Sequence, residues 1–255
     1  MRSRSMLRPG ATLFALAALA LGCAERSSEP DGVIAQAIDP DAALVIRQIY
    51  AAGAEPGAPF SHDFIEIFNR RSAPVSLVGL SLQYASARGG GHFGATAALI
   101  TELPDVVLAP GRSFLVQEAG GSAGAPLAAP DWIDDTPIAM SATAGKVALV
   151  RHATALGCNG GSVPCSPEAT ASIVDLVGYG NADHAETAPA AAPANTAGIL
   201  RALDGCADTN DNAADFRVTA AAPRDSASGG TRCNGASGER VSSFAAATHP
   251  SRQRR

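Results

Sequence analysis

Two apolar runs joined by a short polar turn constrain the fold of this chain more than any other feature. The first, FIEIFN at 64–69, alternates along its length and ends in an asparagine, and the second, VSLVGLSL at 75–82, is interrupted by a glycine. Alternation places Ile65 and Ile67 on one face of a strand, and Glu66 between two phenylalanines on the other. We expect backbone donors of a nearby loop to satisfy this carboxylate. The pattern is typical of a β-sandwich rather than of a helical or α/β enzyme.

Further strand patterns follow at short intervals with turn residues between them. The alanine-rich stretch 187–196 contains two prolines and is expected to be a loop. No segment has a long helical period, so the sequence predicts an all-β domain over 42–233. The expected strands are 43–50, 63–69, 75–77, 80–85, 106–108, 113–117, 146–151, 173–179 and 199–203.

The first 22 residues have the three-part pattern of a secretory signal peptide. Three arginines precede an apolar core at 11–21, which is shorter than the roughly 20 residues that a transmembrane helix needs. The end of this segment, ALGC at 20–23, resembles the lipobox of bacterial lipoproteins, which implies cleavage before Cys23 and lipidation of its thiol. An ordinary signal peptide cut near Ala20 is the alternative.

Lipidation at Cys23 would place the chain on a bacterial envelope. Several acyl chains on one cysteine make a stable membrane anchor, whereas a single chain gives only marginal binding. Ala24 rather than aspartate follows the cysteine, and the resemblance to bacterial lipoproteins then points to the outer membrane, with secretion as the alternative. We interpret 23–41 as a polar tether and 234–255 as a flexible tail.

Four cysteines remain after Cys23, an even number that indicates disulfides in an exported chain. They allow three pairings. The sequence favours Cys158 with Cys165, because the pair brackets a glycine-rich loop, and hence Cys206 with Cys233. A zinc site is disfavoured, because no Cys-x-x-Cys pair or histidine cluster accompanies these residues.

The charge of the chain disfavours direct binding to nucleic acid. The formal net charge is −5, and it becomes −8 when the three arginines of the signal peptide are removed. Only 17% of residues are charged and Lys146 is the single lysine, so the basic face that phosphate contacts need is lacking.

A series of motifs follows in a fixed order along the chain. They are VIRQIY at 45–50, 64–69, 75–82, LAPG at 108–111, Leu115-Val116, GKVAL at 145–149, VDLVGYG at 174–180, Arg201, DTNDNAADF at 208–216 and PRDS at 223–226. This order resembles the lamin-tail domain, most closely its bacterial secreted branch. The resemblance covers roughly 43–227 and implies an immunoglobulin-like β-sandwich. Members of that branch are often fused to an extracellular endonuclease/exonuclease/phosphatase domain.

Two glycine-rich or acidic segments are formal matches to ligand-binding motifs. Gly89, Gly91 and Gly94 satisfy G-x-G-x-x-G, but no βαβ pattern surrounds them, so a flexible loop is expected. The oxygen-rich segment 208–215 is a weak candidate for calcium. Compared with an EF-hand loop it lacks the required glycine and the final glutamate, so turn and capping roles are favoured.

Catalysis is not indicated by the sequence. The pairs His62-Asp63 and Asp183-His184 join adjacent residues, which face opposite ways on a strand, and no nucleophile motif accompanies them. We therefore expect a non-catalytic, lipid-anchored envelope module that requires no cofactor and binds or supports another envelope protein. The alternative, which rests on the resemblance, is an accessory to a separately encoded nuclease or phosphatase. A hydrolase in its own right is the least favoured reading.

Overall fold

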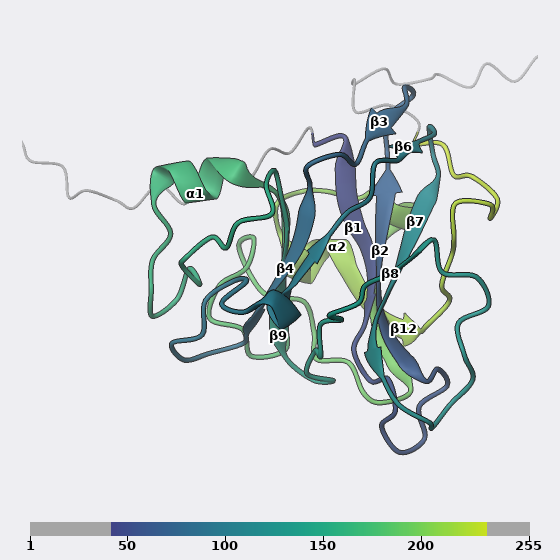
Figure 1. Ribbon diagram of the computed structural model, residues 1–255, viewed down its shortest axis with the longest axis horizontal. Helices are drawn as coiled ribbons and strands as arrows, with labels where there is room; N and C mark the ends of the chain where they lie inside the picture. Colours follow the sequence, from purple (N-terminus) through teal and green to yellow (C-terminus); the bar gives the residue numbers. More distant parts are fainter. Residues whose placement is uncertain (1–41, 234–255) are drawn as a thin grey trace, which may run out of the picture. The chain divides into compact units, whose positions relative to one another are not determined.

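The computed structural model describes residues 42–233, which form two β-sheets packed face to face (Figure 1). In the larger sheet every neighbouring pair is antiparallel except β7 with β8. Its strands, in spatial order, are β12 (Phe216–Ala220), β11 (Ala197–Arg201), β1 (Leu44–Tyr50), β2 (His62–Asn69), β7 (Ser113–Gly120) and β8 (Trp132–Ile133).

The smaller sheet has four antiparallel strands, and a separate two-stranded ribbon lies at one end of the sandwich (Figure 1). The strands of the smaller sheet, in spatial order, are β10 (Ile173–Tyr179), β9 (Gly145–Val150), β4 (Ser81–Ser86) and β5 (Ile100–Glu102). The ribbon pairs β3 (Val75–Ser76) with β6 (Val107–Leu108).

The core lies between the sheets and follows the predicted alternation. Ile65 and Ile67 belong to the central apolar cluster with Leu82 and Leu149 of the smaller sheet. Phe64 faces the opposite way and joins a second cluster with Tyr50, which its ring stacks at a centroid distance of 5.4 Å. Both faces of β2 are therefore buried, and the predicted all-β sandwich is confirmed.

All nine expected strands are present, with small differences at their ends. The structure adds β5, β8 and β12, which the sequence did not indicate. The first two have only three and two residues, too few for a period to show. In β12 four of five residues are exposed or partly exposed, because it lies at the edge of its sheet.

Short helices connect the strands. The α-helix α1 (Pro167–Ser172) begins after Ser166, whose side chain accepts a hydrogen bond from the Ala169 N–H. The remaining helical turns are α2 (Asn212–Asp215) and the 3₁₀ turns η1 (Ala97–Leu99) and η2 (Leu203–Gly205). Within the described part of the chain, none of these helices has the length and apolar character that crossing a membrane requires.

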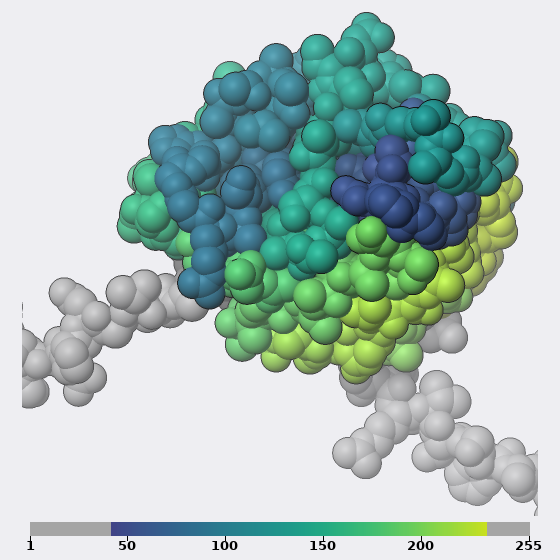
Figure 2. Space-filling view, turned by 90° about the horizontal axis from the view of Figure 1, so that it is seen from below, coloured from purple at the N-terminus to yellow at the C-terminus, as the bar shows by residue number. Residues whose placement is uncertain are grey.

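The two ends of the sandwich differ in their loops. At the end opposite the β3–β6 ribbon, the loops 51–61 and 121–127 lie side by side (Figure 2). Ser61 N donates to Ala125 O at 2.8 Å, and Ala125 N donates to Pro59 O at 2.9 Å. The predicted signal peptide 1–22, the predicted tether 23–41 with Cys23, and the predicted tail 234–255 lie outside the described residues.

Candidate functional site

A buried ion pair joins the two sheets. Asp175 lies on β10 of the smaller sheet, and Arg201 lies at the end of β11 in the larger one. The Arg201 Nη2 group donates to both carboxylate oxygens of Asp175 at 2.8 Å, and its Nε donates to Ile46 O at 3.0 Å. Ile46 N in turn donates to Asp175 Oδ2 at 2.5 Å. Both side chains are almost fully buried, so this contact connects β1, β10 and β11 through the interior.

Further carboxylates surround the same guanidinium. Arg201 Nη1 lies 3.3 Å from Asp208 Oδ1 and 3.6 Å from Asp215 Oδ2. Asp208 also pairs with Arg70, and Asp215 accepts hydrogen bonds from both the backbone N–H and the hydroxyl of Thr209. The Arg201 guanidinium stands 4.6 Å from the centre of the Phe216 ring, in cation–π geometry. One arginine thus compensates several buried acids.

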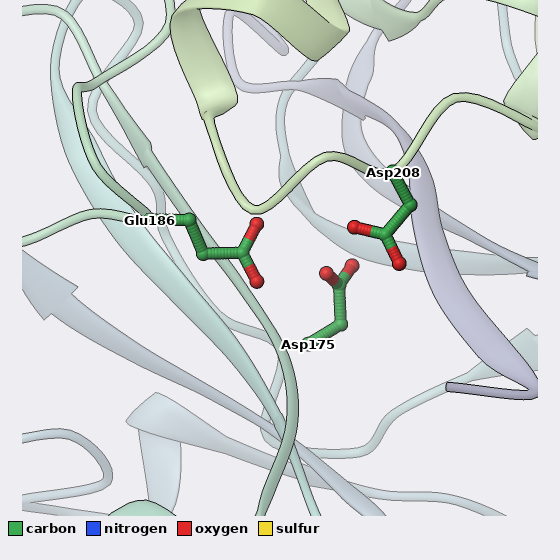
Figure 3. Close-up of side chains that lie close together, drawn as sticks. All are labelled: Asp175, Glu186 and Asp208. Atoms are coloured by element: carbon green, nitrogen blue, oxygen red, sulfur yellow. The ribbon is translucent and has the colours of Figure 1, made fainter. Parts of the chain in front are cut away.

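Glu186 completes the cluster. Its carboxylate faces those of Asp175 and Asp208 (Figure 3), and one oxygen from each of the three lies within 4.8 Å of the others. The pKa of Glu186 is raised to about 9, mainly by burial. The negative charge of Asp175 also raises this pKa, and its effect is larger than the opposing effect of Arg201. Burial also raises the pKa of Asp208 to about 6, against the opposing effect of Arg201. Near neutral pH the folded chain therefore holds a proton on Glu186.

Asn212 fixes this cluster to the smaller sheet. Its Nδ2 donates to Leu176 O at 3.0 Å and to Glu186 Oε2 at 2.8 Å, and its Oδ1 accepts from Gly178 N at 2.9 Å. The residue is fully buried at the start of α2, where Asp211 is the N-cap. The segment 208–216 therefore packs against β10 instead of forming an open loop.

The arrangement is a structural clamp more than a cation site. Three carboxylates at this spacing have the oxygen chemistry that hard cations prefer. Both oxygens of Asp175, however, already accept hydrogen bonds from Arg201, and one also accepts from Ile46 N. The guanidinium already supplies positive charge to Asp175 and Asp208, two of the three carboxylates. We name Asp175, Glu186, Arg201, Asp208, Asn212 and Asp215 the arginine clamp.

The clamp also explains the acidic segment that the sequence offered for calcium. Asp208 is held by two arginines, Asp211 caps α2, Asn212 faces inward and Asp215 binds Thr209. The side-chain oxygens of Asp208, Asp211, Asn212 and Asp215 therefore accept hydrogen bonds from donors of the chain. The capping role favoured from sequence belongs to Asp211, whereas Asp208 and Asp215 pair with Arg201 instead.

The histidine–aspartate pairs are engaged in separate contacts. Asp63 accepts from Gly53 N at 2.7 Å and Met140 N at 3.0 Å, and burial raises its pKa to about 7. Asp183 pairs with the buried Lys146 at 2.7 Å. Burial and the charge of Lys146 lower the pKa of His184. His62 and Asp63 lie at the start of β2, whereas Asp183 and His184 lie in the loop after β10.

The glycine loop is fastened to the loop of the first disulfide. Asn159 Nδ2 donates to Gly89 O at 2.8 Å and to Gly91 O at 3.0 Å, and Phe93 N donates to Cys158 O at 2.9 Å. Lys146 lies in the same region, with its ammonium 5.9 Å from the centre of the Phe93 ring. The loop expected to be flexible therefore has defined partners.

The four domain cysteines form two disulfides, Cys158 with Cys165 and Cys206 with Cys233, which are the pairs that the sequence favoured. The first closes the loop 159–164, whose Asn159 binds the glycine loop at Gly89 and Gly91. The second spans 27 residues and fastens the last described segment to the turn η2. Cross-links of this kind stabilise a domain chiefly by restricting its unfolded chain.

For several buried charged side chains, the sequence gave either no prediction or the wrong hydrogen-bond partner. Glu66 was expected to bind backbone donors, but its main partner is a side chain, the Arg47 Nη1 group at 2.6 Å. A bulge between β1 and β2 places Arg47 between the paired residues Ile46 and Gln48, which a strand pattern does not reveal. Glu118 accepts from Thr101 Oγ1 and Ile138 N, and burial raises its pKa to about 8.

Comparison with known proteins gives little further information. No protein-family model matches the chain, and no curated protein matches it. Among solved structures, it is similar to the crystal structure of a DUF4876 family protein from Bacteroides thetaiotaomicron VPI-5482. The TM-score is 0.47 with 16% sequence identity, over 75% of this chain and 74% of that one. A likeness of this level carries no argument about function.

Proposed function

We propose that this chain is a non-catalytic, lipid-anchored module of a bacterial envelope, built on an immunoglobulin-like sandwich similar to the lamin-tail domain. Its role is to bind or support another envelope component. The observation that carries the proposal is the arginine clamp. Its buried acids, with Glu186 and Asp208 among those whose pKa burial raises, are held by the chain's own donors and join the two sheets.

The motifs behind the lamin-tail resemblance have structural roles that support this interpretation. Asp175, Arg201 and the segment 208–216 are three of the matched features, and all three meet in the arginine clamp. Asn69, another matched residue, is fully buried at the end of β2. Its Nδ2 donates to Ala73 O and Leu108 O at 2.9 Å each, which fixes the ribbon that begins at Val75.

Export is supported by the disulfides. Two bridges within one domain are characteristic of oxidising compartments such as the periplasm or cell surface. The signal-peptide pattern and the lipobox resemblance then supply the route and the anchor. Together they favour an outer-membrane lipoprotein whose folded domain is held away from the bilayer by the tether 23–41.

Mass spectrometry of the native amino terminus tests the anchor. We expect a first peptide that begins at an acylated Cys23, and a protein that sediments with membranes. The Cys23→Ser variant should lose both properties. An unmodified terminus near residue 21 would instead support an ordinary signal peptide and remove the anchor from the account.

Cross-linking in intact cells tests the binding role. The full-length protein should recover an envelope component, and purified protein should show no hydrolysis of nucleic acid or phosphate esters with or without a chelator. Recovery of no envelope component under any condition, or hydrolysis that the chelator abolishes, would contradict a non-catalytic binding module.

A further inference from the structure

The connection between β8 and β9 crosses from the larger sheet to the smaller one. We name its middle part, 138–141, the strap. The side chains of Ile138 and Met140 belong to the central apolar cluster, whereas Ala139 and Ser141 between and after them are exposed. The strap therefore contributes two side chains to the core without being a strand of either sheet.

Two buried carboxyl groups of the larger sheet hold the strap from one side. Ile138 N donates to Glu118 Oε2 at 2.7 Å, and Met140 N donates to Asp63 Oδ2 at 3.0 Å. Glu118 lies on β7 and Asp63 on β2, and both are almost fully buried. Ala119 N adds a backbone hydrogen bond to Ile138 O at 3.1 Å. The strap is thus fastened to the larger sheet chiefly through two acidic side chains.

Two tyrosines of the smaller sheet hold the strap from the other side. Ser141 N donates to the Tyr84 hydroxyl at 3.1 Å, and the Tyr179 hydroxyl donates to Ser141 O at 2.8 Å. Burial raises the pKa of both phenols above their ordinary value, so they keep their protons throughout the neutral range. The tyrosine contacts therefore stay the same with pH, and the carboxyl groups are the contacts that can change.

The hydrogen-bond partners of the two carboxyl groups show which of them can hold a proton. Both oxygens of Asp63 accept from backbone N–H groups, which cannot accept a proton in return. Glu118 Oε1 instead lies 2.8 Å from the hydroxyl of Thr101, which can accept as well as donate. A protonated Glu118 can therefore donate to Thr101 Oγ1 while its other oxygen still accepts from Ile138 N.

The surrounding charges also favour a neutral Glu118. Burial raises its pKa to about 8 against the lowering effect of its two hydrogen bonds, and the negative charges of Asp134 and Asp63 add to the rise. Within 42–233, neither Glu118 nor Asp63 forms an ion pair with a basic side chain. The other titratable groups that interact with the two acids are Glu55, Asp134, Tyr50, Tyr84 and Tyr179. All of these are acids, so an ionised Glu118 has no compensating charge among them.

We propose that the strap is a proton-controlled latch. With a proton on Glu118, the strap lies closed over the core. When Glu118 loses that proton to the solvent, the strap detaches from β7, water reaches the carboxylate, and the apolar side chains of Ile138 and Met140 become exposed. The latch belongs to the domain itself and does not depend on the proposed lipid anchor or on a partner.

The latch should open as the pH rises. A carboxyl with a pKa of about 8 in the closed state and an ordinary value of 4.5 stabilises the closed strap fully below pH 4.5. This stabilisation is lost as the pH rises through 8. For these two values, the ratio of open to closed strap increases about 50-fold between pH 6 and pH 8.

Hydrogen exchange of the strap amides measures this opening. The full mature chain with Cys23→Ser would be exchanged at pH 6 and at pH 8, and the rates corrected for the intrinsic effect of pH. Between these pH values, the protection of peptides that contain 138–141 should fall about 50-fold more in this parent than in the same chain with Glu118→Gln. Peptides from 145–150 report opening of the whole domain and should change less.

The variants separate the latch from a merely structural role of Glu118. In Glu118→Gln, the amide can accept from Ile138 N and donate to Thr101, as the protonated acid does. The strap of this variant should therefore be more protected than that of the parent at pH 8, which a damaging substitution would not produce. Glu102→Gln makes the same change at an exposed position next to Thr101, and it should follow the parent. Asp134→Asn removes a charge that raises the pKa of Glu118, and it should increase protection at pH 8 by a smaller factor.

Three results would overturn the inference. They are an equal fall of protection in the parent and in Glu118→Gln, lower protection in that variant than in the parent at pH 8, and an equal fall in 145–150, which would mean that the whole domain opens. Far-UV circular dichroism shows whether each variant folds. If Glu118→Gln does not fold, Asp134→Asn decides, and protection at pH 8 no greater than that of the parent refutes the latch.

Discussion

Replacement of Arg201 by methionine removes the charge at the centre of the arginine clamp while keeping an apolar side chain of similar length. Each carboxylate oxygen of Asp175 then loses the hydrogen bond that it accepts from Arg201 Nη2. Removing one partner of a buried pair costs about 3–5 kcal/mol, because the other charge remains buried without compensation. A domain of this size has roughly 5–15 kcal/mol in total. We therefore expect a folded but strongly destabilised variant.

The cost should also depend on pH in a defined direction. Arg201 lowers the pKa of Asp208, which burial holds at about 6, so its loss raises that pKa further. When a carboxyl has a higher pKa in the folded than in the unfolded chain, it stabilises the fold fully at pH values below the unfolded-state pKa. This stabilisation is lost as the pH rises through the folded-state pKa. The destabilisation by Arg201→Met should accordingly be larger at pH 8 than at pH 5.5.

Urea unfolding at the two pH values, followed by the fluorescence of Trp132 and by far-UV circular dichroism, measures both effects. Arg151→Met is the control, because Arg151 is exposed after β9 and its replacement should change stability by no more than about 0.5 kcal/mol. Arg201→Lys keeps a charge but loses the planar fork, and we expect an intermediate cost. A loss below about 1 kcal/mol in Arg201→Met, or one that is equal at both pH values, would refute the clamp.

Three further predictions concern single residues. The pKa of Glu186 is about 9 in the fold and near 4.5 when exposed, so its contribution to the free energy of unfolding weakens as pH rises between these values. In urea unfolding, Glu186→Gln should make the fall of stability with pH shallower by about 1.4 kcal/mol per pH unit. An unchanged slope would contradict the shift. Gly111→Ala should lower the melting temperature more than Gly57→Ala, since both have positive φ but only Gly111 faces nearby backbone; equal shifts would refute the close approach. Asn159→Ala should speed tryptic cleavage after Arg88 by releasing the glycine loop, and an unchanged rate would show that these hydrogen bonds do not hold it.

The sequence was a good guide to strands with a clear period. The alternation at 64–69 predicted which side of β2 faces the other sheet, because the pleat of a strand fixes that choice locally. It gave no sign of β12, whose residues are mostly exposed at a sheet edge and pair with β11, which lies before them in the chain. Edge strands depend on the partner more than on their own pattern.

The site was visible from sequence only in pieces. Segment 208–216 drew attention by its oxygen-rich composition, and Asp175 and Arg201 by their place in matched motifs. Their meeting depends on the packing of two sheets, with Arg201 paired to a residue 26 positions earlier. Arg47 was missed for a related reason, since a bulge in β1 directs it to Glu66.

The central claim is that the carboxylates around Arg201 are satisfied by donors of the chain itself. A calcium titration of the mature protein tests this directly, with the melting temperature and the heat of binding as readouts. The account predicts the same melting temperature in millimolar calcium and in chelator, and no saturable heat. A saturable rise in melting temperature that Asp208→Asn abolishes would contradict it, because the acids would then be ligands of a cation.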